Sequence, residues 1–260
     1  MPFTVAHAAA ALPLRRAVGG RLVLSALVVG TMSPDFEYLA YLNTHRTISH
    51  TLPGLVLMCL PLSLAVLAVW HGVVKRPLAG LLPDQCAPLA AAAQQSFAFR
   101  PWRRLWLLCV SVLVGAFTHL VWDAFTHSDG WFVVRAGVLR WAVPPTGMPA
   151  YEVLQLLSSV VGMLAVLVAL HRWAVRQPRR VVRPPLRVEP PGRCRRAAGA
   201  AWILGAAAAA ALVNLGRYAG YPHDSQDLLT AALLGALTGS AVASVAYSVA
   251  SRLRWPRHGT

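Results

Sequence analysis

The sequence is poor in charged residues, which make up only 13% of its 260 residues. Soluble domains carry about a quarter. Hydrophobic residues, in contrast, make up 57%. A water-soluble protein with this composition would have too little polar surface, because helices buried in its core would need many amphipathic helices around them. The shortage of charge therefore argues against a soluble domain and indicates a membrane protein.

Cysteine is also scarce, with four residues in the chain: Cys59, Cys86, Cys109 and Cys194. No two of them form a CxxC pair, and two lie in apolar runs. Spacings of this kind exclude a disulfide framework and a cysteine zinc site of the usual type. We therefore expect the cysteines to be ordinary packing or loop residues.

What the chain does have is apolar runs, and five of them are long enough to cross a bilayer. A spanning helix needs roughly 17–25 mostly apolar residues. The runs cover residues 52–74, 105–122, 153–170, 197–216 and 228–250. The last two are rich in alanine and glycine, which allow close helix packing within lipid. The predicted fold is all-α: a polytopic transmembrane helical bundle with five full spans and a short N-terminal helical hairpin.

The N-terminal hairpin is predicted from two shorter apolar stretches, residues 3–14 and 22–32, joined by a turn at 15–20. Each stretch would be about 16 Å long as a helix, which is too short for a relaxed span. A re-entrant or tilted hairpin packed within the bundle suits that length. A cleaved signal peptide is the alternative, but the second stretch ends in Ser33-Pro34-Asp35, without a small-x-small cleavage site.

The net charge of +15 could indicate nucleic-acid binding, but the basic residues lie where a membrane protein carries them. Residues 171–196 are rich in arginine and contain a single acid, Glu189. Lys and Arg are enriched in cytoplasmic loops, so this segment is placed inside and the other loops follow by alternation. Most acids then fall outside. We expect a multi-pass cell-membrane protein with membrane lipid as a partner, no nucleic acid, and basic loops and C-terminus in the cytoplasm.

The composition divides the chain into four parts. Residues 1–172 form a motif-bearing membrane domain, and 173–196 an Arg/Pro-rich cytoplasmic linker of the extended, solvated kind. Residues 197–251 form a two-helix membrane hairpin, and 252–260 a basic tail.

The clearest polar motif is His119-Leu-Val-Trp-Asp123-Ala-Phe-Thr-His127. Side chains four residues apart share one face of a helix, as in helical metal-binding motifs. Imidazole and carboxylate ligands together suit Zn²⁺, Fe or Mn. The alternative is two histidines at the membrane interface and an aspartate that caps a helix end. The triplet alone leaves both open.

Three further polar groups fall on the same predicted side of the membrane as this triplet. They are His45 and His50, the turn that carries Asp35 and Glu37, and His7. Ionisable residues at membrane depth usually have a function. Seven candidate ligands result: His7, Asp35, His45, His50, His119, Asp123 and His127. They exceed the needs of one tetrahedral zinc and would suffice for two ions. We expect a divalent metal, most simply zinc, as one or two ions at the outer end of the bundle.

Four separated motifs carry a resemblance to a known family over roughly residues 1–172. They are Met-Pro-Phe-Thr-Val-Ala-His7, Met-Ser-Pro-Asp35-Phe-Glu-Tyr, Ser-His50-Thr-Leu-Pro-Gly and the His119–His127 motif. Together they resemble a bacterial family of membrane proteins with a domain of unknown function. That family is similar, more remotely, to inner-membrane metal-dependent hydrolases, and through them to the zinc-dependent phospholipase C and P1-nuclease group. The resemblance implies a membrane-embedded metal-dependent hydrolase with these His and Asp residues as ligands.

Two classes of function compete. The first is a hydrolase that acts on phosphoester or lipid head-group substrates, in which a metal activates water and Glu37 or Asp129 serves as the base. The second is a non-enzymatic protein: a transporter or proton pathway, since intramembrane His and Asp chains relay protons, or a metal-stabilised scaffold. We favour the hydrolase, because the polar groups gather at one end instead of spreading across the bilayer. Substrate and oligomeric state are not readable from the sequence.

Overall fold

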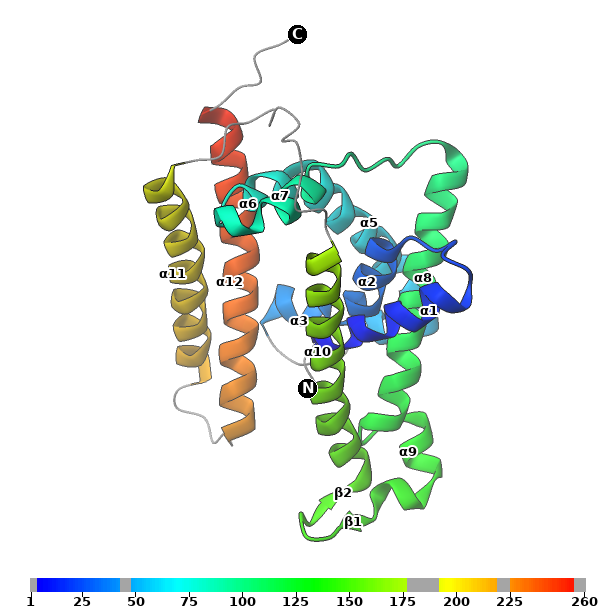
Figure 1. Cartoon of the computed structure of the whole chain (residues 1–260). Helices are drawn as coiled ribbons and strands as arrows, with labels where there is room; N and C mark the ends of the chain where they lie inside the picture. The colour runs from blue at the N-terminus through cyan, green and yellow to red at the C-terminus, as the bar shows by residue number, and fades with distance from the viewer. Residues whose placement is uncertain (1–3, 43–47, 177–191, 219–224, 255–260) are drawn as a thin grey trace. The chain divides into compact units, whose positions relative to one another are not determined.

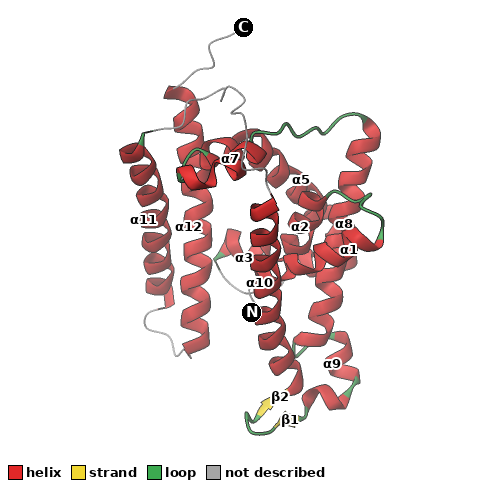
Figure 2. Ribbon diagram, viewed as in Figure 1, coloured by secondary structure: helices red, strands yellow, loops and turns green. Residues whose placement is uncertain are grey.

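The computed structural model describes residues 4–42, 48–176, 192–218 and 225–254. Almost all of them are helical, and strands in this part of the chain are limited to one short antiparallel pair (Figure 2). In chain order the elements are η1 (Thr4–Ala10), α1 (Ala11–Ala17), α2 (Leu24–Met32), η2 (Ser33–Asp35), α3 (Phe36–Tyr41), η3 (Ile48–His50), α4 (Leu52–Gly54), η4 (Leu55–Cys59), α5 (Leu60–Val69), η5 (Trp70–Val74), α6 (Lys75–Ala79), η6 (Asp84–Cys86), α7 (Ala87–Ala93), α8 (Trp102–Thr126), α9 (Trp131–Arg135), η7 (Gly137–Arg140), β1 (Ala142–Val143), β2 (Met148–Pro149), α10 (Ala150–Arg176), α11 (Arg193–Tyr218) and α12 (Ser225–Arg254).

Among the residues that the structure describes, five helical segments are long and apolar enough to span a membrane, which confirms the all-α prediction and is compatible with a multi-pass membrane protein. They cover Leu52–Ala79, Trp102–Arg135, Ala150–Arg176, Arg193–Arg217 and Leu228–Leu253. Each includes the apolar run predicted for it, and most extend past it into arginine-containing turns. Arginine is a good helix former, and its long side chain reaches from a helix end to the polar head groups. The apolar run of each segment therefore marks the part suited to lipid, and the helix continues beyond that run at its ends.

The contacts group the chain into two compact units. The first comprises Met1–Glu37, His45–Leu67 and Ala98–His171, and the second comprises Tyr38–Thr44, Ala68–Phe97 and Arg172–Thr260. Residues 68–97, which the sequence assigns to the motif-bearing domain, thus group with the C-terminal helices. Every candidate ligand among the described residues lies in the first unit.

The centre of the first unit is the packing of α2 against α8 (Figure 1). The two backbones approach closely at a pair of glycines. A Cβ atom on Gly115 would collide with the Leu27 carbonyl and lie 2.8 Å from the Thr31 nitrogen, and one on Gly30 would lie 2.8 Å from the Val112 Cα. Small residues allow such close approach between helices in lipid. This contact fixes the register between α2 and α8.

The N-terminal segments differ from the prediction in where they turn. Arg15 and Arg16 belong to α1, and the break comes at Gly19 and Gly20, which have positive φ angles of 61° and 75°. Glycine adopts that left-handed conformation without strain and commonly ends helices. The turn predicted at 15–20 therefore lies a few residues later, before α2 begins at Leu24.

In the second unit, α11 and α12 pack side by side along most of their length (Figure 1). A Cβ atom on Gly235 or Gly239 would collide with backbone atoms of α11, so glycine is what allows the close contact. A buried hydrogen bond joins the same two helices: Asn214 Nδ2 donates to the Ala231 carbonyl at 2.8 Å. The Ala- and Gly-rich composition of the last two spans is thus used for tight pairing, as predicted.

Candidate metal centre

The last two turns of α8 carry the central residues of the site. His119 and Asp123 are four residues apart on one face and are only 1% and 6% exposed, as the spacing predicts. His127 follows directly after the helix as its C-cap residue, with extended backbone angles. The first two side chains therefore point into the unit, and the third borders the same region with 19% of its side chain exposed.

His119 is held in one tautomer by the backbone of α2. Its Nδ1 atom lies 2.8 Å from the Thr31 carbonyl oxygen. A carbonyl can only accept, so Nδ1 carries a proton, and in the neutral imidazole Nε2 carries the lone pair. Histidines that bind metal generally donate their other N–H to a carbonyl or carboxylate in this way. The close approach of α2 and α8 at Gly30 and Gly115 brings the carbonyl within reach.

His50 is held in the same tautomer by a different network. Ser49 Oγ donates to the Pro34 carbonyl at 2.8 Å, so its oxygen must accept from His50 Nδ1, which lies 2.9 Å away. Glu37 Oε1 lies 3.4 Å from the same Nδ1 atom. Both neighbours stabilise a proton on Nδ1, and the lone pair of His50 Nε2 faces the site.

Two carboxylates face these lone pairs. Asp35 Oδ1 lies 3.4 Å from His119 Nε2 and 3.5 Å from His50 Nε2. Asp123 Oδ2 lies 3.5 Å and 3.8 Å from the same two nitrogens. Four ligands placed about 2.1 Å from a tetrahedral ion are about 3.4 Å apart. The donor set and its spacing therefore fit a zinc-sized divalent cation.

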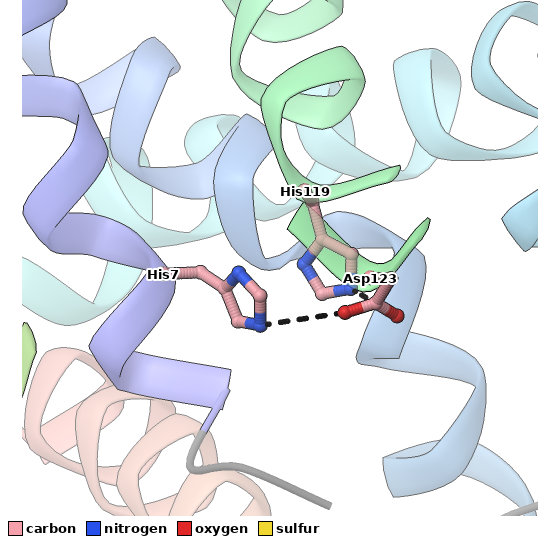
Figure 3. A group of neighbouring side chains, drawn as sticks. All are labelled: His7, His119 and Asp123. Carbon is pink, nitrogen blue, oxygen red and sulfur yellow. Dashed lines mark ion pairs between the residues drawn. The ribbon is translucent and has the colours of Figure 1, made fainter. Parts of the chain in front are cut away.

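The second oxygen of Asp123 faces two other imidazoles. Oδ1 lies 3.9 Å from His7 Nε2 and 3.5 Å from His127 Nδ1. The ring of His7 stacks on that of His119, with centroids 3.9 Å apart (Figure 3). Two overlapping groups of three donors have ligand atoms within 4.8 Å of one another: His7, His119 and Asp123, and Asp35, His50 and His119.

His7 and Asp35 lie outside the candidate spans, and the shifts of their pKa values suit metal binding. Burial, assisted by the neighbouring His119, lowers the pKa of His7 to about 4, so its imidazole is neutral at pH 7. Burial alone would raise the pKa of Asp35, but the adjacent imidazoles, His119 first and then His50, hold that pKa well below its usual range. Asp35 is thus an anion, and a ligand must have a free lone pair to bind.

The buried Nε2 atom of His119 has no hydrogen-bond partner among the described residues. Its lone pair faces carboxylate oxygens, and two acceptors with nothing between them repel in a medium of low dielectric. A positive charge between them, carried by a metal ion or by a second proton on the ring, removes the repulsion. The arrangement therefore favours a cation at this point.

The structure thus brings together five of the seven predicted ligands: His7, Asp35, His50, His119 and Asp123. His127 borders them through Asp123, and His45 lies outside the described residues. Of the two predicted bases, Glu37 is buried against His50, whereas Asp129 is exposed in the turn after α8. These outcomes concern position, and metal binding itself stays a prediction.

Three supporting residues were not predicted: Thr31, Ser49 and Gln155. Thr31 contributes its backbone carbonyl, for which the sequence carries no signal. Gln155 Nε2 lies 3.1 Å from His127 Nε2. The sequence did indicate a role for Gln155, because a glutamine in an otherwise apolar span is costly unless it has a partner.

A comparison with known protein families matches most of the chain. A family model described as a domain of unknown function (DUF4184) matches residues 1–249. The chain belongs to the DUF4184 family. The match contains all five clustered donors and runs past residue 172 through most of α12, so DUF4184 includes the C-terminal helix pair. No match was found among curated proteins or among solved structures.

Proposed function

We propose that this DUF4184 protein is a membrane-embedded, metal-dependent hydrolase. The observation that carries the proposal is the set of four donor atoms of Asp35, His50, His119 and Asp123, whose measured nitrogen–oxygen separations are 3.4–3.8 Å. The two histidines present their lone pairs to that set, because Thr31 and Ser49 take the protons on the other nitrogens.

The residues divide into ligands and residues that orient them. His7, Asp35, His50, His119 and Asp123 would hold the ion, and Glu37 would orient His50 through Nδ1, as carboxylates do for metal-bound histidines. A divalent ion held there would lower the pKa of water and offset negative charge on a substrate oxygen. Zinc is the simplest choice for imidazole and carboxylate donors at this spacing.

The base in the proposed reaction must exchange its proton with solvent. Glu37 is poorly suited, since its side chain is 1% exposed and its oxygen lies 3.4 Å from His50 Nδ1. Asp129 lies two residues after His127 and is exposed to solvent, so we propose Asp129 as the base. Its role is tested by Asp129→Asn, which should lower turnover and leave bound metal unchanged.

The substrate we propose is a phosphoester, most simply a lipid head group, because the site lies in a chain with five candidate spans. The charge distribution of the loops supports an orientation with the basic loops and the C-terminus in the cytoplasm and the metal centre on the outer side. In this arrangement α1 and α2 form the short hairpin that does not fully cross the bilayer.

The decisive experiment is metal analysis of the full chain purified in detergent without chelator. We expect stoichiometric divalent metal, most simply zinc, in the native protein and its loss in His119→Ala and Asp35→Asn. His171→Ala is the matched control, since His171 is exposed on α10, outside the donor cluster. Release of a chromogenic phosphodiester product should follow the metal content. Absence of metal from the native protein would refute the proposal, and vesicle uptake that depends on His119 would favour the transporter alternative.

A further inference from the structure

His127 has two ring nitrogens in different surroundings. Its Nδ1 atom is near three oxygens: Asp123 Oδ1 at 3.5 Å, the Asp123 carbonyl at 3.4 Å and Thr126 Oγ1 at 3.4 Å. Thr126 Oγ1 donates its own proton to the Trp122 carbonyl at 3.1 Å, so it can only accept from His127. All three oxygens are therefore acceptors, and the proton of a neutral imidazole belongs on Nδ1.

The other nitrogen of His127 faces an amide of α10. Gln155 Nε2 lies 3.1 Å from His127 Nε2. An amide nitrogen donates, so the imidazole nitrogen accepts and carries the lone pair. The two sides of the ring thus specify the same tautomer independently. In that tautomer Nδ1, the atom nearest to Asp123, has no lone pair to offer a metal.

Gln155 is itself held in place by α10. Ser158 Oγ and Ser159 Oγ both donate to the backbone carbonyl of Gln155, at 3.0 and 2.7 Å, and so hold the main chain from which the Gln155 side chain projects. Ser158 Oγ in turn accepts from Trp122 Nε1 of α8 at 3.2 Å. One turn further along α10, Gly162 packs so closely on the first segment that a Cβ atom there would lie 2.8 Å from the Ala6 carbonyl. α10 therefore joins the segment of His7 to the end of α8.

We infer that His127 and Gln155 are positioning residues for the metal site, and that His127 is not one of its ligands. Gln155 fixes the His127 tautomer, and the Nδ1–H of His127 attracts Asp123 Oδ1 across 3.5 Å, which favours the carboxylate orientation in which Oδ2 faces His50 and His119. This inference rests on the proposed metal-dependent function and deepens it.

The set of imidazoles available to a metal follows from the same tautomers. His119 and His50 each use Nδ1 as a donor to protein oxygens, and His127 does the same. In the neutral form each of these imidazoles has one lone pair, and that of His127 is taken by Gln155. The histidine nitrogens left for metal are therefore those of His7, His50 and His119, which belong to the two donor groups that share His119.

The test compares replacements of His127 that keep or remove the N–H donor. His127→Asn retains an N–H near the position of Nδ1 but offers no imidazole nitrogen, whereas His127→Ala removes both. Residues that orient a metal ligand typically contribute about 10–100-fold in metal affinity. We expect His127→Ala and Gln155→Glu to weaken zinc binding by about that factor, and His127→Asn to stay within about threefold of the native protein.

X-ray absorption of the zinc-loaded protein supplies the second measurement, since it counts imidazole ligands directly. We expect the same imidazole count in the native protein and in His127→Asn. If His127→Asn loses affinity as fully as His127→Ala, or loses one imidazole, His127 is a ligand and the inference is wrong while the metal-dependent function stands. If the native protein binds no zinc, both fail together.

Discussion

Replacing Gly115 by alanine tests how the helix packing builds the metal site. A Cβ atom there would lie 2.8 Å from the Thr31 nitrogen and closer still to the Leu27 carbonyl. Ordinary van der Waals contact begins at 3.4 Å, so α2 and α8 must separate by at least about 0.6 Å locally. If Thr31 moves by that amount, the distance from His119 Nδ1 to its carbonyl rises from 2.8 Å to about 3.4 Å, near the limit of a hydrogen bond.

Two consequences are expected from Gly115→Ala. Overpacking at a tight contact costs about 1–3 kcal/mol of stability. Loss of the bond that orients His119 should raise the zinc dissociation constant about 10–100-fold. Zinc titration and thermal unfolding in the same detergent measure both quantities.

The matched control is Gly205→Ala, the same chemical change in α11 at a glycine with nothing within 4 Å of the added atom. Alanine favours a helix over glycine by up to about 1 kcal/mol, so this variant should be at least as stable as the native protein and should bind zinc equally well. If Gly115→Ala retained native zinc affinity, the link between helix spacing and the His119 tautomer would be refuted.

Three other predictions follow from single features of the structure. Because the pKa of Asp35 is held well below its usual range, its carboxylate is ionised throughout pH 5–8; Asp35→Asn should weaken zinc binding at least about 10-fold even at pH 5, and native affinity of the variant in zinc titrations would contradict this. Asn214→Ala removes the bond to Ala231 and should destabilise the α11–α12 pair by roughly 0.6 kcal/mol, with an upper range of about 1.7, measurable by reversible unfolding in bicelles. Cys194 is exposed and should resist a membrane-impermeant maleimide in intact cells, whereas a cysteine at Ser128 should react; the reverse pattern would invert the proposed orientation.

The fold was largely predictable because lipid imposes a simple requirement on the sequence. A helix in hydrocarbon must be apolar over its whole spanning length, so each of the five apolar runs lies in one of the long helical segments of the described residues. The grouping of residues 68–97 with the C-terminal helices was not predictable. It depends on contacts between segments far apart in the chain, and neither composition nor periodicity encodes them.

The site was predictable in part for a similar reason. The spacing of four residues places His119 and Asp123 on one face of a helix. Ionisable residues in apolar surroundings usually pair with one another, so the other His and Asp residues were expected beside them. The tautomers could not be predicted, since they depend on a Thr31 carbonyl and a Ser49 hydroxyl that the fold brings to the imidazoles. Gln155 could have been noticed as an isolated amide in an apolar run, but nothing in the sequence pairs it with His127.

The donors of the metal centre enter the structure at very different stages of synthesis. His7, Asp35 and His50 lie in the first fifty residues, whereas His119 and Asp123 belong to a helix that is made much later. A nascent chain that inserts segment by segment therefore carries its early imidazoles and carboxylate beside the bilayer before their partners exist. Insertion of α8 would be the step that brings all five together, so the proposed metal would be bound only after that helix has entered the membrane. In this protein the acquisition of the ion would report that the first unit has been assembled.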